Sequence, residues 1–206
     1  MCPDTGYRQI TGQSPHGRFR LLLTEPADCE IIRIPRDSGG YDPGIPVEIE
    51  SAEGRLTIAT FAGGHGLETT AFVGPGETHF TLINAGTGFF VPYADPSKAV
   101  RLPANPVRFS KLLYEGQLLV LADWTHVHAM DENGHLWQSV RLGYDDVEIE
   151  HINDDEIVGS AWDAPSDTQV GFKLETKSGR IKSGGVFSAP QCTPEPYWHR
   201  NMDESQ

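Results

Sequence analysis

The feature of this chain that most constrains its fold is an internal repeat. The chain has 206 residues, and residues 118–137 align with 156–182 when 164–170 are treated as an insertion in the second copy. Each copy contains an aliphatic segment, a tryptophan, a second apolar segment, a polar turn ending in glycine and a third segment. A unit of this size cannot bury its own apolar face, so the copies are expected to stack on one another.

The segments of the repeat, and those that precede it, have the pattern of β-strands. Several alternate apolar and polar residues with the period of two of a half-buried strand, and none sustains a helical period near 3.6. The 22 glycines and 15 prolines divide the chain into short pieces, as in an all-β protein. A turn or helix start is expected at 95–98. The strands expected outside the repeat are 19–24, 29–34, 46–51, 55–62, 68–73, 79–84 and 147–152.

The turns and tryptophans of the two copies predict specific local structure. The turns DENG and TKSG have the composition of β-hairpin turns, and their last residues, Gly134 and Gly179, are expected to need a positive φ angle. Trp124 and Trp162 align with each other. A tryptophan repeated at one place in a β unit is expected to pack between neighbouring units. The alternative is an exposed binding residue that stacks on a sugar or contacts a protein partner.

The first copy, 118–137, resembles the blade core of PQQ-type and related β-propellers. In those blades an aliphatic strand is followed by a second strand, an Asp, a turn with Gly and a strand that ends in Trp. The residues that carry the resemblance are Val127, Ala129, Asp131, Gly134, Leu136 and Trp137. At roughly 40 residues a blade, the resemblance implies a small propeller of four or five blades. A β-barrel or a twisted β-sandwich made of similar hairpins is the alternative.

We therefore expect an all-β protein built of repeated antiparallel hairpin units, with a propeller-like arrangement. A single all-β domain is expected over 1–188, followed by a polar, proline-containing C-terminal tail over 189–206. The region 145–185, with GSAWDAPSD and a KSGR turn, also resembles a group of uncharacterised bacterial proteins. That resemblance implies no activity.

The charge of the chain narrows its range of partners. The formal net charge is −13. A surface this negative repels phosphate backbones and anionic lipid, so neither a nucleic-acid partner nor a membrane partner is expected. The same charge favours solubility and a basic protein partner.

The cysteines and the apolar runs bear on the compartment of the protein. The three cysteines, Cys2, Cys29 and Cys192, form no CxxC pair and suit a reducing compartment. The first residues lack the apolar core of a secretory signal, and no apolar run approaches the roughly 20 residues that cross a bilayer. A cytoplasmic protein is expected.

Three histidines near the first copy form a candidate metal site. His126 and His128 project from the same face of a strand, and pairing of Met130 with His135 brings His135 to that face. Such a set could bind one divalent transition metal, such as zinc, and serve a metal-dependent hydrolase or lyase. This is the alternative in which the protein has a metal cofactor and is an enzyme.

The repeat argues against the metal site. The positions of the second copy that match the three histidines hold residues of a solvated surface, namely Gly171, Lys173 and Arg180. The positions that match Val127, Ala129 and Leu136 hold residues of a core, namely Phe172, Leu174 and Ile181. We therefore expect Val127, Ala129 and Leu136 to point into the core, and the imidazoles to point into water.

Other candidate sites are weaker, and they leave binding as the favoured function. The GGHG turn around His65 lacks the context of a phosphate-binding loop, and Glu148 and Glu150 are expected on a solvated strand face. No nucleophile elbow or cofactor motif is found. We therefore expect a non-catalytic β scaffold that binds another protein through its loops and an acidic rim. A carbohydrate-binding module that uses Trp124 or Trp162 is a further alternative.

Overall fold

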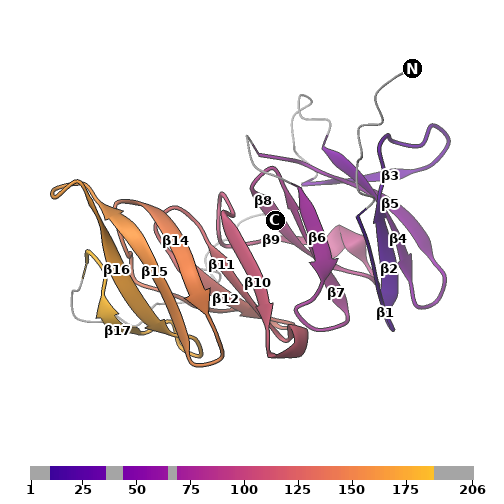
Figure 1. Ribbon diagram of the computed structural model, residues 1–206. Helices are drawn as coiled ribbons and strands as arrows, with labels where there is room; N and C mark the ends of the chain where they lie inside the picture. The colour runs from indigo at the N-terminus through magenta and orange to yellow at the C-terminus, as the bar shows by residue number, and fades with distance from the viewer. Residues whose placement is uncertain (1–9, 36–43, 65–68, 188–206) are drawn as a thin grey trace, which may run out of the picture.

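The computed structural model describes residues 10–35, 44–64 and 69–187, and nearly all of its regular structure is β-strand (Figure 1). Two short 3₁₀ helices, η1 (Pro96–Lys98) and η2 (Tyr114–Gly116), are the helical elements of this part of the chain. None of the helices in the described ranges is long and apolar enough to cross a membrane. The all-β prediction is confirmed, and the turn expected at 95–98 is η1, capped by Asp95.

The first sheet has the strand order β1-β2-β4-β5-β3. Its pairs are antiparallel except β3 with β5, which is parallel. β3 lies at the edge of the sheet, beside β5. The connection from β2 to β3 must therefore cross β4 and β5. The strands are β1 (Thr11–Ser14), β2 (Gly17–Leu21), β3 (Ile31–Ile34), β4 (Ile45–Ser51) and β5 (Leu56–Phe61).

The other three sheets are four-stranded antiparallel meanders whose strands follow one another in chain order, which is the form of a propeller blade. The second sheet contains β6 (Thr70–Val73), β7 (His79–Asn84), β8 (Thr87–Pro92) and β9 (Val100–Arg101). The third contains β10 (Phe109–Leu113), β11 (Leu118–Ala122), β12 (Val127–Asp131) and β13 (Gly134–Gln138). The fourth contains β14 (Asp145–Ile152), β15 (Glu156–Asp163), β16 (Thr168–Glu175) and β17 (Ile181–Gly184).

The four sheets stand in a row in chain order, with the first and the fourth at opposite ends (Figure 1). An apolar core fills each junction between neighbouring sheets. The third sheet therefore has a core on both faces. Alternate residues of β11 serve the two cores: Leu119 and Leu121 pack with the second sheet, whereas Val120 and Ala122 pack with the fourth. Consequently all five residues of β11 are buried.

The predicted orientation of the first repeat copy is partly confirmed. Val127 and Ala129 are fully buried, as expected. Leu136 was expected in the core but is 51% exposed. The reason is a bulge between β12 and β13, where Met130 pairs with His135 but Ala129 pairs with Trp137. The extra residue displaces Leu136 outward and turns Trp137 into the core instead.

The expectation that all the imidazoles are wet is wrong for His128, which is 2% exposed. His128 pairs with Leu121 on the face of the third sheet that the second sheet covers. The matching Lys173 is exposed because it lies on the outer face of the fourth sheet, over which the described ranges place no further sheet. The two copies share a strand pattern, but in the described residues only the copy in the third sheet has another sheet packed against this face.

The sequence alignment of the two copies is also displaced by one residue in their first strands. In the third sheet Val120 lies opposite Ala129, whereas in the fourth Ile157 lies opposite Leu174. Carried along the strand, this displacement matches Trp162 with Thr125 rather than with Trp124. The turn glycines do behave as predicted, with φ angles of 121° at Gly134 and 67° at Gly179.

Some expectations fall outside the described residues. These are the C-terminal tail over 189–206, the histidine of the GGHG turn, and two of the three cysteines. The assignment of 1–188 to one domain stays a prediction. The remaining cysteine, Cys29, is exposed with a free thiol.

Candidate functional site

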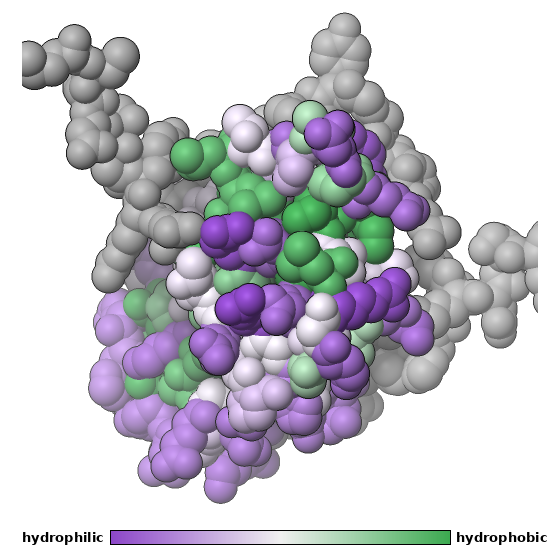
Figure 2. All heavy atoms as spheres, turned by 90° about the vertical axis from the view of Figure 1, so that its right-hand side faces the viewer, coloured by the Kyte–Doolittle hydropathy of each residue, from purple (hydrophilic) through white to green (hydrophobic). Residues whose placement is uncertain are grey.

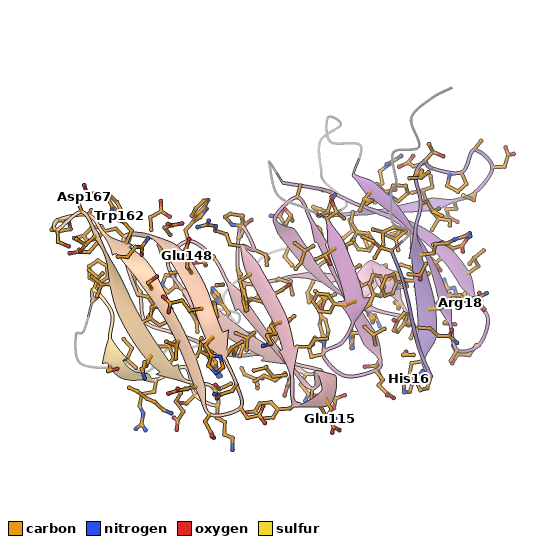
Figure 3. The ribbon with its side chains drawn as sticks, in the orientation of Figure 1. His16, Arg18, Glu115, Glu148, Trp162 and Asp167 are labelled. Carbon is orange, nitrogen blue, oxygen red and sulfur yellow. The ribbon has the colours of Figure 1, made fainter. Side chains whose placement is uncertain are left out.

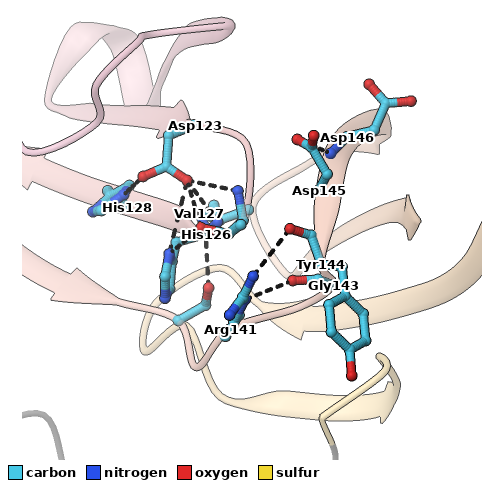
Figure 4. Close-up of polar contacts among 11 residues, drawn as sticks. Asp123, His126, Val127, His128, Arg141, Gly143, Tyr144, Asp145 and Asp146 are labelled. Atoms are coloured by element: carbon cyan, nitrogen blue, oxygen red, sulfur yellow. Dashed lines mark hydrogen bonds and ion pairs between the residues drawn. The ribbon is translucent and has the colours of Figure 1, made fainter. Parts of the chain in front are cut away.

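Asp123 organises the histidine cluster. It directly follows β11. Its Oδ1 accepts hydrogen bonds from the backbone N–H groups of Thr125, at 2.7 Å, and His126, at 2.8 Å (Figure 4). Its Oδ2 forms a 3.0 Å hydrogen bond with Nε2 of His128. Burial by itself would raise the pKa of Asp123, but the hydrogen bonds from His126, His128 and the backbone together lower it. The carboxylate is therefore ionised at neutral pH.

The three histidines do lie in a row, as the strand register predicted. The ring centroids of His126 and His128 are 6.1 Å apart, and those of His128 and His135 are 5.9 Å apart. Two of the rings have polar partners within the protein. Nδ1 of His126 lies 2.8 Å from the hydroxyl of Thr125, and Nε2 of His128 is held by Asp123. Burial, followed by the neighbouring His128, lowers the pKa of His135 to about 4.

This arrangement gives no support to a metal centre. Within the described ranges, no group of three or more His, Cys, Asp or Glu side chains is placed to hold a metal ion. Asp123 is not among the residues that the sequence pattern singles out. The signal for it is an Asp directly after an aliphatic strand, because an Asp side chain in a turn often accepts a hydrogen bond from the backbone N–H two residues further on.

The two tryptophans singled out by the repeat lie at one edge of the molecule. The start of β14 runs between them: the N–H of Val147 donates to the carbonyl of Trp124 at 3.1 Å, and the N–H of Tyr144 donates to that of Trp162 at 2.9 Å. Trp162 lies with Asp167 at the upper tip of the fourth sheet in Figure 3. The strand ends of two sheets thus bring distant residues into one surface. We call this surface the rim, and define it as Arg108, Trp124, Tyr144, Asp145, Asp146, Trp162 and Asp167.

Trp124 does not pack in a core between units. It is 41% exposed, and the guanidinium of Arg108 lies 3.9 Å from the centre of its ring. Arg108 also forms a 2.7 Å ion pair with Asp146, whose other oxygen accepts a 3.2 Å hydrogen bond from Gln169. One ring face is therefore covered by an arginine that is itself held by a carboxylate.

The other aromatic residues of the rim also have polar neighbours. The indole N–H of Trp162 donates to Asp167 at 3.2 Å, and Tyr144 is 38% exposed with Arg141 5.5 Å from the centre of its ring. Asp146 and Asp167 have φ angles of 56° and 51°, in the left-handed region that residues other than glycine rarely adopt. Such backbone costs about 1–3 kcal/mol and is found disproportionately at binding and catalytic sites.

The carboxylates of the rim outnumber its cations. Among the residues that define the rim, Arg108 is the cation that faces Asp145, Asp146 and Asp167, and the adjacent Arg141 adds a second positive charge while its guanidinium donates to the carbonyls of Gly143 and Tyr144. Glu148, which follows on β14, is exposed as expected of a solvated strand face. The rim thus presents aromatic surface within a negative field.

Comparisons with known proteins give similarities of fold only. No protein-family model and no curated protein matches the chain. Among solved structures, the chain is similar to hydrazine synthase from Kuenenia stuttgartiensis, with a TM-score of 0.43 and 12% identity over 85% of this chain and 48% of that one. It is also similar to a protein from Agrobacterium tumefaciens assigned as TolB, with a TM-score of 0.34 and 11% identity over 86% of this chain and 82% of that one. The chain spans about half the length of the hydrazine synthase chain that it matches.

Proposed function

We propose that this protein is a non-catalytic, propeller-like scaffold that binds a basic segment of another protein through the rim. The observation that carries the proposal is that Trp124, Tyr144 and Trp162, three exposed or half-buried aromatic residues, lie on hydrogen-bonded backbone segments along one line of strand ends. Binding residues are commonly held on loops and strand ends by a rigid β framework.

The chemistry of the rim suits recognition of a protein rather than a reaction. Trp, Tyr and Arg are the side chains that most often dominate the energy of protein interfaces. Exposed carboxylates such as Asp145 supply partners for lysine and arginine, and they speed the approach of a basic molecule. A metal-dependent hydrolase or lyase and a carbohydrate-binding module remain predictions that no particular contact of the described residues favours.

The test is a selection from a library of displayed peptides, with the full chain immobilised. We expect peptides rich in Lys and Arg to be enriched. The double variant Trp124→Ala, Trp162→Ala should bind those peptides at least about tenfold more weakly, because it removes the central aromatic surface. The association rate should fall as the salt concentration rises from about 0.05 to 0.5 M, because salt screens the attraction to the carboxylates.

The control is Leu136→Ala, which removes an exposed apolar side chain from β13, outside the rim. It should bind the selected peptides as the unchanged chain does. Enrichment of acidic or neutral peptides, or binding that survives loss of both tryptophans, would show that the rim is not a site for a basic partner.

A further inference from the structure

A cavity lies between the first two sheets, at their edge strands β3 and β9. Its volume is about 310 Å³, at the lower end of the range of about 300–1,000 Å³ that small-molecule sites occupy. Residues 32–35 line it on the side of the first sheet. Residues of β8, η1 and β9, together with the residue that follows η1, line it on the side of the second sheet. The cavity is remote from the rim, which belongs to the third and fourth sheets.

The wall supplied by the first sheet is apolar. Side chains of β3 alternate between two faces, and those of Ile32 and Ile34 pack in the core against the second sheet. Ile31 and Arg33 therefore point to the outer face, which Figure 2 shows as hydrophobic surface in its middle and upper part between polar groups. Glu25 makes a two-pronged ion pair with Arg33, at 2.8 and 3.1 Å. The charge of Arg33 is thus already matched by a carboxylate.

The opposite wall carries a cation. Arg101 of β9 pairs directly with Phe89 of β8, and side chains that stand opposite each other in an antiparallel pair lie on the same face of the sheet. Phe89 is fully buried in the core with the first sheet, and Ala99 packs against the same core. Arg101 therefore lies on the face that the first sheet covers, but it is exposed because β9 is the edge strand. The cavity has apolar walls and a guanidinium at its mouth.

Arg101 differs from the other cations near the cavity in having no ion pair with any described residue. Arg33 has Glu25 as its partner, and Lys98 lies 3.7 Å from a carboxylate oxygen of Asp95. An arginine without a carboxylate is unexpected in a chain with 29 acidic and 16 basic residues. The ligand that would match its charge is an anion, and a carboxylate suits the planar guanidinium because the two can form parallel hydrogen bonds.

The main chain at the two edges adds hydrogen-bond donors. The N–H of Leu102 donates to β8, and the carbonyl of Ile34 accepts a hydrogen bond from Ala62, which follows β5. Successive residues of a strand direct their N–H and C=O groups to opposite sides. Those of Arg101 and Arg33 are therefore directed to the free edges of β9 and β3, beside the cavity. Main-chain N–H groups thus supplement the guanidinium as donors to an anion.

We propose that this cavity binds a small organic carboxylate with an apolar body, of which a short fatty acid is the simplest example. The hydrocarbon part lies between Ile32, Ile34 and Phe89, and the carboxylate pairs with Arg101. An inorganic anion would leave the apolar walls in water, so the hydrocarbon part contributes to the affinity. The net charge of −13 repels anions at long range, and binding therefore depends on these local contacts.

Titration of the full chain with hexanoate, followed by heteronuclear NMR, tests the proposal. We expect the amide signals of β3, β8 and β9 to shift and to saturate at about 1–10 mM, as is usual for so small a ligand. Hexanamide has the same length without the charge, and it should bind at least about tenfold more weakly. Arg101→Gln should weaken the binding of hexanoate by a similar factor, because it removes the charge-assisted hydrogen bonds.

Arg180→Gln is the matched control, since it makes the same change at an exposed arginine of the fourth sheet, and it should leave the affinity unchanged. Ala99→Leu should weaken binding although Arg101 is retained, because the larger side chain fills the cavity. Spectra recorded without ligand show whether each variant is folded. Absence of binding, or equal binding of hexanoate to Arg101→Gln, would overturn the proposal. Equal binding of hexanamide, or binding of hexanoate that Ala99→Leu leaves unchanged, would overturn it as well.

Discussion

At the residue scale, the candidate site depends on Asp123. Its carboxylate bonds two backbone N–H groups and the ring of His128, which is buried between two sheets. A buried carboxylate needs this number of donors, because loss of its hydration is otherwise too costly. Asp123 thus joins His126 and His128 in one hydrogen-bond network.

The stability of the protein should depend on pH through His135. Its pKa is lowered from 6.5 to about 4 in the native state, by burial first and then by His128. Between these values the unfolded chain binds more protons than the native one, so the free energy of unfolding should decrease as the pH falls from about 6.5 to 4. Above pH 6.5 the full contribution of His135 is present. Denaturant midpoints measured across this range provide the test.

The variant His135→Gln should make the free energy of unfolding depend less on pH between about 6.5 and 4. The loss of stability below about pH 4 should remain. Asp123 contributes to this loss, together with other carboxyls whose pKa is lowered in the native state, such as Glu25 and Asp95. The native pKa of Asp123 lies below its ordinary value of 3.8, so its contribution is present above that value and is lost in acid. A variant profile that matches the original between pH 6.5 and 4 would mean that His135 is not the group responsible.

At the scale of elements, the junction of the third and fourth sheets depends on a turn. Gly179 ends the TKSG turn of the fourth sheet and lies against the ring of Trp137, which the bulge in the third sheet turns inward. A Cβ atom at Gly179 would overlap that ring. The bulge and the glycine thus belong to one packing arrangement, although Trp137 and Gly179 are 42 positions apart in the sequence.

Alanine at Gly179 should therefore be more damaging than alanine at Gly54. Both glycines have left-handed backbone, with φ angles of 67° and 77°, so each substitution should cost about 1–2 kcal/mol in backbone energy. Nothing lies within 4 Å of a Cβ at Gly54, whereas at Gly179 the displaced Trp137 should add about 1–3 kcal/mol. Chemical denaturation measures both. Equal losses of stability would show that the Trp137 contact is not tight.

At the scale of the whole molecule, stability should be greatest in the second and third sheets. Each of them has a core on both faces, and β11 is buried along its length. The first and fourth sheets each have a core on one face within the described chain. The sheets that are packed on both faces therefore lie in the middle of the row.

Amide hydrogen exchange should reveal this gradient. We expect the amides of β11 and β12 to exchange at the rate of global unfolding, and those of β1 and β17 to exchange faster through local opening. Mass spectrometry after brief labelling would resolve the strands. Faster exchange in β11 than in β17 would contradict the packing described here.

How far the sequence predicts the fold can be judged from particular residues. The strand pattern, the positive φ angles at Gly134 and Gly179, and the burial of Val127 and Ala129 were all correct, because alternation and turn chemistry act between near neighbours. The location of Trp124 and Trp162 at one edge was not foreseen. It depends on the start of β14, which runs between the ends of two strands that belong to different sheets.

The sequence by itself determined that the chain forms β-hairpin units with one reliably apolar face, since that information resides in each segment and its turns. Tertiary structure alone decided the state of the opposite face. His128 and Lys173 hold matching positions in the repeat, yet one is buried and the other is exposed, because a neighbouring sheet covers only the first. Burial of a strand's second face depends on what stacks against it, and no pattern within the strand records that.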